Sequence, residues 1–300
     1  MTQYQVACFG EVLWDILPDK ALPGGAPMNV AYHLQKLSVP VAMISSIGND
    51  EPGQTLLEIL KQYQLTTDYI QTDPVHETGK VYARPSSDNP LEMKYEIIQP
   101  VAWDYISFTS SLRELAQQTG DTFLVFGSLA ARNIDSRQTL LSLLKGNRTF
   151  ILDINLRPPH FDQELLVELL HHCHILKLNE TELSIIGDWH QWPDNMEAKV
   201  KALSTQYAIP TIIVTLGEKG AALLKGGKFY QHPGYPVKVA DTIGSGDAFL
   251  AGYLYSTIKK YDPSDSLAFS CALGALVASY QGGCPDYQKT EITTLIAAHK

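Results

Sequence analysis

The chain has 300 residues, of which 45% are hydrophobic, enough to bury the core of one large or two ordinary globular domains. Its net charge is -9, and without a basic stripe this argues against a nucleic-acid-binding or membrane-surface protein. No apolar run reaches the roughly 18 residues of a membrane span, so we expect no membrane partner. We expect a cytoplasmic protein because the N-terminus lacks a basic-then-apolar leader. The cysteines lack paired spacing, which indicates neither a disulfide framework nor a zinc site.

Short apolar, β-branched segments alternate with segments of helical periodicity along the chain. The strand-like segments are residues 5–9, 41–47, 123–126, 150–154, 175–178 and 211–215, and the helical ones are 29–37, 54–63, 136–144, 163–171 and 196–207. This alternation predicts an α/β fold with a doubly wound, mainly parallel sheet and helices on both faces. With neither a linker nor a repeat, we expect one domain over residues 1–300.

Residues 80–84 and 92–98 alternate in polarity and flank a loop rich in Pro and Ser, which predicts a hairpin. Together with the segment after Gly10, it predicts a small β-sheet lid over a substrate, formed by residues of about 11–24 and 76–106. An exposed sheet favours burial against a second copy, so a homodimer through the lid is expected.

A glycine-rich turn, Gly244-Ser245-Gly246, lies between a predicted strand at 235–239 and a predicted helix. Glycines expose successive backbone N–H groups, and the positive end of a helix attracts phosphate. Asp247 follows in the first helical turn. It either caps the helix or accepts a proton from a hydroxyl that attacks a phosphoryl group, and this turn alone leaves both roles open.

A second glycine turn, Gly24-Gly25, precedes the helix that carries Asn29. The glycine pair lets a small polar ligand approach the backbone, and the Asn29 amide offers a donor and acceptors to hydroxyl groups. Asp15 has the oxygens to chelate two neighbouring hydroxyls. A plain turn and a surface carboxylate would explain these residues equally well. The chain has neither a P-loop nor a dinucleotide-binding glycine fingerprint.

Together, the two glycine turns and four further segments resemble, in order and separation, the signatures of the ribokinase-like (PfkB) carbohydrate kinases. The further segments are residues 47–53, 153–157, 177–182 and 215–220. The resemblance spans nearly the whole chain and implies a ribokinase-like fold. The run Gly-Glu-Val-Leu-Trp-Asp-Ile-Leu-Pro at 10–18, with Asn155 and Arg157, makes the chain most similar to the fructokinases.

The resemblance implies a role for each matching residue. Asp247 would be the catalytic base, and the amides of Gly244, Ser245 and Gly246 the anion hole for the transferring phosphoryl group. The residues expected to bind the sugar are Asp15, Gly24, Gly25, Asn29, Asn155 and Arg157.

Nucleotide and metal sites follow from the same resemblance. The residues expected to bind nucleotide are Asn179, Thr215, Gly217, Gly220 and Gly246. Glu182 would hold Mg²⁺ through water, as this hard cation prefers oxygen ligands and retained waters. Asp241 and Ile243 match positions that bind K⁺ in some relatives, but Asp286 departs from the residue type found there. The expected cofactors are therefore Mg²⁺ with ATP, and K⁺ as an open question.

The function implied is ATP-dependent transfer of the γ-phosphate to a hydroxyl of a ketohexose, foremost fructose to fructose 6-phosphate. Other substrates stay open: ribose, a nucleoside, or a 2-keto-3-deoxy sugar acid, for which Arg84 or Lys94 of the lid would supply a cation. A non-catalytic sugar or nucleotide sensor on the same scaffold is a further alternative. Trp14 and Trp103 either stack on a sugar face or pack in the core and lid.

Overall fold

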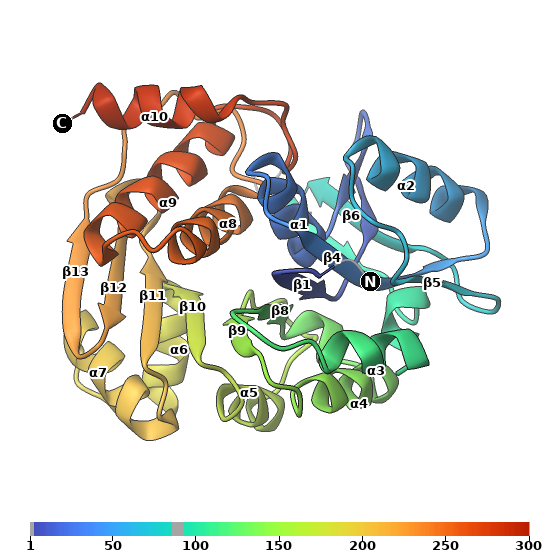
Figure 1. The fold of residues 1–300 in the computed structure, drawn as a ribbon, viewed down its shortest axis with the longest axis horizontal. Helices are drawn as coiled ribbons and strands as arrows, with labels where there is room; N and C mark the ends of the chain where they lie inside the picture. Colours follow the sequence, from blue (N-terminus) through green and yellow to red (C-terminus); the bar gives the residue numbers. More distant parts are fainter. Residues whose placement is uncertain (1–2, 86–92, 300) are drawn as a thin grey trace.

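The computed structural model describes residues 3–85 and 93–299, and its largest element is a nine-stranded sheet (Figure 1). The strands of this sheet are β1 (Val6–Phe9), β4 (Val41–Gly48), β5 (Ile70–Asp73), β8 (Phe123–Gly127), β9 (Thr149–Asp153), β10 (Ile175–Asn179), β11 (Thr211–Thr215), β12 (Ala221–Lys225) and β13 (Lys228–His232). Each strand-like segment predicted at 5–9, 41–47, 123–126, 150–154, 175–178 and 211–215 is a strand within one residue or so.

The strand order is β13-β12-β11-β10-β9-β8-β1-β4-β5. All neighbours from β11 to β5 pair in parallel, and β12 and β13 add an antiparallel edge. The chain therefore winds outward from β1 in both directions, and the predicted doubly wound sheet is confirmed. In such sheets the carboxyl ends of the strands meet at one edge, where ligands bind beside the point at which the strand order reverses.

Helices cover both faces of the sheet (Figure 1). Two large hydrophobic cores flank the sheet. The helices that pack on the first core are α1 (Ala26–Lys36), α2 (Glu51–Gln62), α8 (Ser245–Ile258), α9 (Pro263–Ala278) and α10 (Lys289–Ala297). Those that pack on the second are α3 (Ser110–Ala116), α4 (Ile134–Leu143), α5 (Gln163–Leu170), α6 (Glu180–Trp189) and α7 (Met196–Tyr207). Side-chain alternation along β1 explains the two cores, since Val6 and Cys8 enter the first while Ala7 and Phe9 enter the second.

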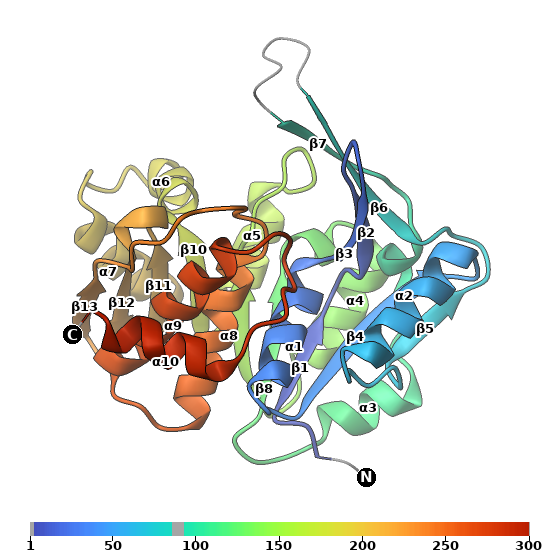
Figure 2. The same cartoon turned by 90° about the horizontal axis from the view of Figure 1, so that it is seen from above.

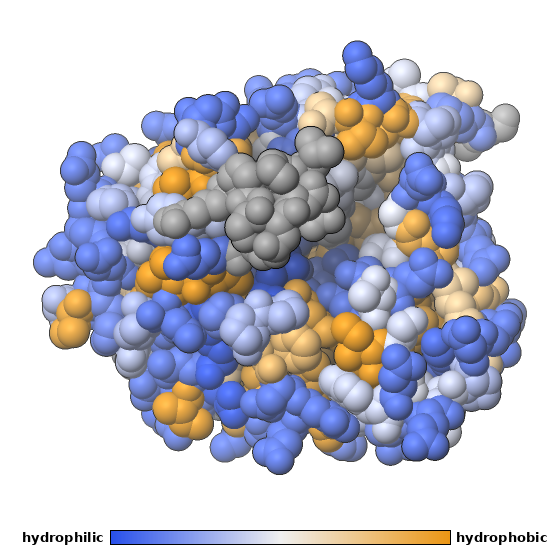
Figure 3. Space-filling model, turned by 180° about the vertical axis from the view of Figure 1, so that it is seen from behind, coloured by the Kyte–Doolittle hydropathy of each residue, from blue (hydrophilic) through white to orange (hydrophobic). Residues whose placement is uncertain are grey.

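A separate four-stranded sheet has the order β3-β2-β6-β7. Its strands are β2 (Leu13–Ile16), β3 (Ala21–Gly24), β6 (Gly79–Pro85) and β7 (Met93–Ile97), and Figure 2 shows β6 and β7 standing out from the main body. Antiparallel pairing of β6 with β7 confirms the predicted hairpin, although the loop at 86–92 lies outside the described residues. On the face seen in Figure 3, hydrophobic residues gather in small groups between hydrophilic ones.

The strand predicted at 235–239 is wrong. Prolines at 233 and 236 lack the N–H that a sheet ladder needs, and this segment crosses to α8 without joining a sheet. The amides of Ala240 and Asp241 donate instead to the Ala278 carbonyl at the end of α9. The predicted helix start is confirmed, because α8 begins at Ser245.

Trp103 is completely buried and lies against the guanidinium of Arg132, 4.0 Å from the ring centroid, so it packs in the core and does not stack on a sugar. Trp14 donates through its indole nitrogen to the Pro52 carbonyl. Within the part of the chain that the structure describes, no helix is long and apolar enough to cross a membrane.

Candidate active site

The turn before α8 has the geometry of an anion-binding helix start. Gly244 has a φ of +73°, and a Cβ there would lie 2.5 Å from the Gly283 backbone, so only glycine fits. The Ser245 amide donates to Thr242 at a long 3.3 Å, whereas the amides of Gly246 and Asp247 lie in the first turn, where no intrahelical acceptor exists. These N–H groups and the helix dipole are suited to a phosphate group.

Asp247 is held in place by α1. The Asn29 amide donates to Asp247 Oδ2 over 2.8 Å, and the Cys284 thiol donates to the other end of the same amide over 3.3 Å. Burial raises the pKa of Asp247 to about 6, and Asp153 adds to this, while Lys177 and Asn29 oppose it. The carboxylate is therefore ionised at neutral pH and poised to accept a proton.

A cavity of about 720 Å³ brings together most of the residues predicted from the sequence. It lies at the carboxyl ends of β9, β10 and β11, beside the start of α8. Of the predicted site residues, those that line it are Asp15, Gly25, Asn29, Asn155, Arg157, Asn179, Glu182, Thr215, Ile243, Gly244, Gly246 and Asp247.

Five predicted residues do not line this cavity. A Cβ on Gly24 would lie 2.1 Å from an Asp15 oxygen, and one on Gly220 would lie 2.0 Å from the His232 carbonyl. Gly217 has a φ of +60° and open space around it. The Ser245 hydroxyl donates to the Thr242 carbonyl over 2.9 Å, and Asp241 accepts the amides of Ile243 and Gly282. Their expected contacts with ligands stay predictions.

Glu11 is a cavity residue that the sequence analysis missed. It follows β1, is 3% exposed, and accepts the Ala26 amide at the start of α1 over 3.2 Å through Oε1. Burial raises its pKa to about 7, and burial likewise raises that of Asp15 to about 6. A carboxylate directly after a fully apolar strand was the available signal.

Asp153 and Lys177 were also missed. They end β9 and occupy the middle of β10, and the Lys177 ammonium lies 2.9 and 2.8 Å from the two Asp153 carboxylate oxygens. Both side chains line the cavity and are at least nine-tenths buried. Charged residues inside otherwise apolar strands would have identified them.

A family model described as pfkB family carbohydrate kinase matches residues 19–290. The chain belongs to this kinase family. It is 27% identical to the fructokinase of Salmonella typhimurium, over 93% of this chain and 94% of that one. It is therefore an enzyme that transfers a phosphoryl group to a sugar hydroxyl.

Solved structures of fructokinases share the fold. That of a double mutant of the Vibrio cholerae O395 enzyme bound to fructose, ADP and potassium ion superimposes with a TM-score of 0.83 at 23% identity, covering 98% of this chain and 99% of that chain. That of the Xylella fastidiosa enzyme with bound ATP superimposes with a TM-score of 0.85 at 21% identity, covering 99% of each chain. The ribokinase-like fold of this kinase is confirmed.

Glu182 of the kinase links two cavity segments. Its Oε1 accepts the Leu156 amide and its Oε2 the Asn179 amide, both at 2.8 Å, while the Asn179 side chain caps α6 in return. Burial raises the pKa of Glu182, and the amides of Asn179 and Leu156 oppose this. Each oxygen keeps a lone pair for a further partner.

The Glu182 carboxylate is a suitable ligand for Mg²⁺ held through water. Among residues 3–85 and 93–299, no three His, Cys, Asp or Glu side chains form a metal-binding group. Mg²⁺ is commonly bound by one or two carboxylates together with waters and substrate phosphates, and Glu182 supplies one carboxylate to this cavity. The metal role of Glu182 stays a prediction.

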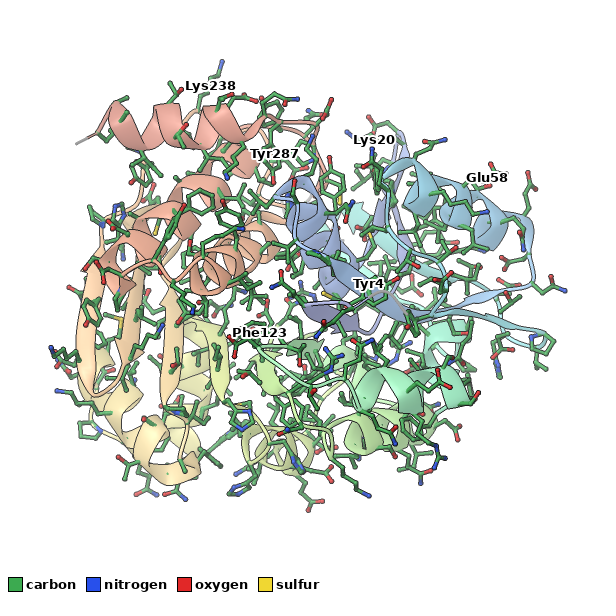
Figure 4. All side chains as sticks on the ribbon, in the orientation of Figure 1. Tyr4, Lys20, Glu58, Phe123, Lys238 and Tyr287 are labelled. Atoms are coloured by element: carbon green, nitrogen blue, oxygen red, sulfur yellow. The ribbon has the colours of Figure 1, made fainter. Side chains whose placement is uncertain are left out.

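Residues 282–287 form a strap that joins the α8 turn to α1. On the α8 side, Asp241 Oδ2 accepts the Gly282 amide over 3.0 Å. On the α1 side, His33 contacts the Gly283 carbonyl and the Tyr287 hydroxyl, at 2.9 and 3.2 Å, and Tyr287 lies beside α1 in Figure 4. The strap thus contacts both the helix that carries Asn29 and the turn that precedes Asp247.

Asp286 of the strap forms an ion pair with Lys36 of α1 at 2.5 Å. Its carboxylate is therefore engaged with α1, and the K⁺ expected near Asp241 and Ile243 stays a prediction. The backbones of Arg84 and Lys94 pair across β6 and β7, but their side chains lie outside the described part of the chain.

Proposed function

We propose that the kinase phosphorylates a ketohexose with ATP, foremost fructose at O6, and that Asp247 is the catalytic base. The observation that carries this proposal is the placement of Asp247. It lies in the first turn of an anion-binding helix, is fixed by Asn29, and faces a cavity of about 720 Å³ that is large enough for a sugar and nucleotide phosphates.

In the reaction, the sugar hydroxyl oxygen forms a bond to the γ-phosphorus as the bond from that phosphorus to the bridging oxygen breaks. The electron pair of the broken bond stays on the β-phosphate of ADP, and the hydroxyl proton passes to Asp247. Phosphoryl transfer has a loose transition state, so in-line positioning and charge stabilisation outweigh base strength. The amides of Gly244, Ser245 and Gly246 would donate hydrogen bonds to the transferring group. For this, the Ser245 amide would have to break its long hydrogen bond to the Thr242 carbonyl.

Nucleotide would lie over the carboxyl ends of β10 and β11. Asn179 and Thr215 line the cavity there, and Gly217 and Gly220 shape the turn that follows β11. Bound Mg²⁺ would neutralise phosphate charge, with Glu182 orienting its waters. Asp241 and Ile243 would supply oxygens to K⁺ if the kinase uses it.

The sugar would bind between Asp15, Arg157 and the Gly24-Gly25 turn, with Asn155 alongside. Fructose is favoured because the similar Salmonella typhimurium protein is named a fructokinase. Ribose, a nucleoside and a 2-keto-3-deoxy sugar acid are the other acceptors to test.

The small sheet would act as a lid, from residues of about 11–24 and 76–106, within one domain over residues 1–300. Burial of its outer face against a second copy would give a homodimer. The free cysteines of the described residues are compatible with the reducing cytoplasm.

The test measures ADP release over a panel of fructose, other hexoses, ribose, nucleosides and 2-keto-3-deoxygluconate, with and without K⁺. NMR of the fructose product identifies the phosphorylated oxygen. Asp247→Asn should lower kcat by orders of magnitude and leave fructose binding, measured by calorimetry, nearly unchanged. Normal turnover in that variant, or no turnover of any sugar by the wild type, would contradict the proposal.

A further inference from the structure

Lys177 is a charged side chain at the centre of a buried strand. It is 7% exposed, whereas its neighbours Leu176 and Leu178 belong to the core beneath α5 and α6. Because side chains alternate along a strand, Lys177 points to the opposite side of the sheet, toward α8 and the cavity. Asp153 accepts two of its hydrogen bonds from the adjacent strand.

The Lys177 ammonium lies against the anion-binding turn. A Cβ added to Gly246 would lie 3.4 Å from Lys177 Nζ and 3.9 Å from its Cε, so the missing side chain of Gly246 makes room for the amine. Burial disfavours the charged amine, but Asp153 and Asp247 outweigh it, and the pKa of Lys177 is raised above its ordinary value. Positive charge is thus fixed beside the amides that receive the phosphoryl group.

Such a pair is a poor device for stability alone. Removing two charges from water costs several kcal/mol for each ion, and apolar residues of similar size are often as stable or more so. An ammonium has three N–H donors, and Asp153 takes two of them. One donor remains at the side of the group that faces Gly246.

We propose that Lys177 is a catalytic residue that donates a hydrogen bond to the transferring phosphoryl group, and that Asp153 is the positioning residue that holds the ammonium at Gly246. This rests on the proposed transfer at the Gly244–Asp247 turn. Lys177 keeps all its protons throughout the step, since the hydroxyl proton goes to Asp247 and the broken bond leaves its electron pair on ADP. Its charge stabilises the equatorial oxygens of the transition state.

The main experiment compares Lys177→Met with Lys199→Met. Lys199 of α7 is the matched control. Like Lys177 it is a buried lysine, 6% exposed, and its ammonium lies 2.9 Å from one carboxylate oxygen, that of Asp194. At saturating fructose and ATP, Lys177→Met should lower kcat by about 10²–10³-fold, the usual cost of one oxyanion donor, with the KM for fructose changed less than about threefold. Lys199→Met should keep the wild-type kcat, and Lys177→Arg should recover part of the loss.

Binding of a transition-state analogue supplies a readout besides turnover. Calorimetry with ADP, Mg²⁺, fructose and aluminium fluoride should show at least about tenfold weaker affinity in Lys177→Met, whereas ADP alone binds as in the wild type. A purely structural lysine would weaken both complexes equally.

The pH dependence of kcat separates the two partners of the pair. Lys177 lowers the pKa of Asp247 and Asp153 raises it, so Lys177→Met should move the acid limb to higher pH and Asp153→Asn to lower pH. The other groups that bear on Asp247 stay in place in both variants: Asn29 of α1, Glu11 before β2, Asp15 within β2, Arg157 after β9, and Cys284 of the strap.

Wild-type kcat in a folded Lys177→Met, equal weakening of both ADP complexes, or shifts of the acid limb in the same direction for both variants would each overturn the proposal. If Lys177→Met does not fold, Lys177→Arg and Asp153→Asn decide it by kcat and the acid limb. Normal turnover by Asp247→Asn would instead overturn the proposed function itself.

Discussion

Replacement of Asn29 separates two roles for this side chain, as a sugar ligand or as the partner of the base. Asn29→Ala removes the amide that donates to Asp247 over 2.8 Å. A hydrogen bond to a charged group contributes about 1.5–3 kcal/mol, and 1.36 kcal/mol corresponds to one pKa unit. The pKa of Asp247, about 6 with Asn29 present, should therefore rise by roughly one to two units.

The assay is kcat against pH at saturating fructose and ATP. The acid limb should move from near pH 6 to about pH 7–8, because the protonated carboxyl cannot accept the hydroxyl proton. Gln35→Ala, on the same helix but outside the cavity lining, is the control and should keep the wild-type profile. A large rise in the KM for fructose with an unmoved acid limb would show that Asn29 acts on the sugar and would refute this reasoning.

Two further predictions concern stability and the strap. Gly244→Ala should unfold at a lower temperature and lose most of its activity, since its Cβ would lie 2.5 Å from the Gly283 backbone at a φ of +73°; an unchanged Tm would contradict this. Burial lowers the pKa of His33 to about 4, so the folded state resists protonation and stability should fall as the pH drops from about 6.5 toward 4. Chemical unfolding of wild type and His33→Gln at several pH values measures this, and equal losses in the two proteins would contradict the role of His33.

The sequence predicted the fold where hydrophobic periodicity is strong. Each of the six predicted strands of the large sheet lies in a segment of apolar, β-branched residues that is buried on both faces, so local pattern and packing agree. The segment at 235–239 instead alternates between apolar and other residues, as a strand with one exposed face would, yet it forms no strand. Its prolines and the carbonyl of Ala278, distant in sequence, determine its path.

The site was predicted in part because its glycine turns have local signatures. Gly244 and Asp247 were found from a glycine turn before a helical segment, and the start of α8 at Ser245 confirms that helix start. Glu11, Asp153 and Lys177 lie in segments that also resemble the family, but no role was assigned to them from the sequence. Each lies just after, at the end of, or inside an apolar strand, and its role depends on neighbours that are in one case more than two hundred residues away in the chain. Contacts between side chains on neighbouring strands, such as that of Lys177 with Asp153, cannot be predicted from the periodicity of one segment.

The strap at 282–287 has a consequence for synthesis of the protein. It contacts α1 and the turn before α8, and both are synthesised before the strap itself, so the supports around the Asn29–Asp247 hydrogen bond are completed by a segment made after both of its partners. Nascent chains fold from the N-terminus, and the helices on either side of β1 will be in place well before this closing segment emerges. A growing chain would therefore gain this support for Asn29 and the α8 turn only after residue 287 has been made, however much of the sheet has already formed.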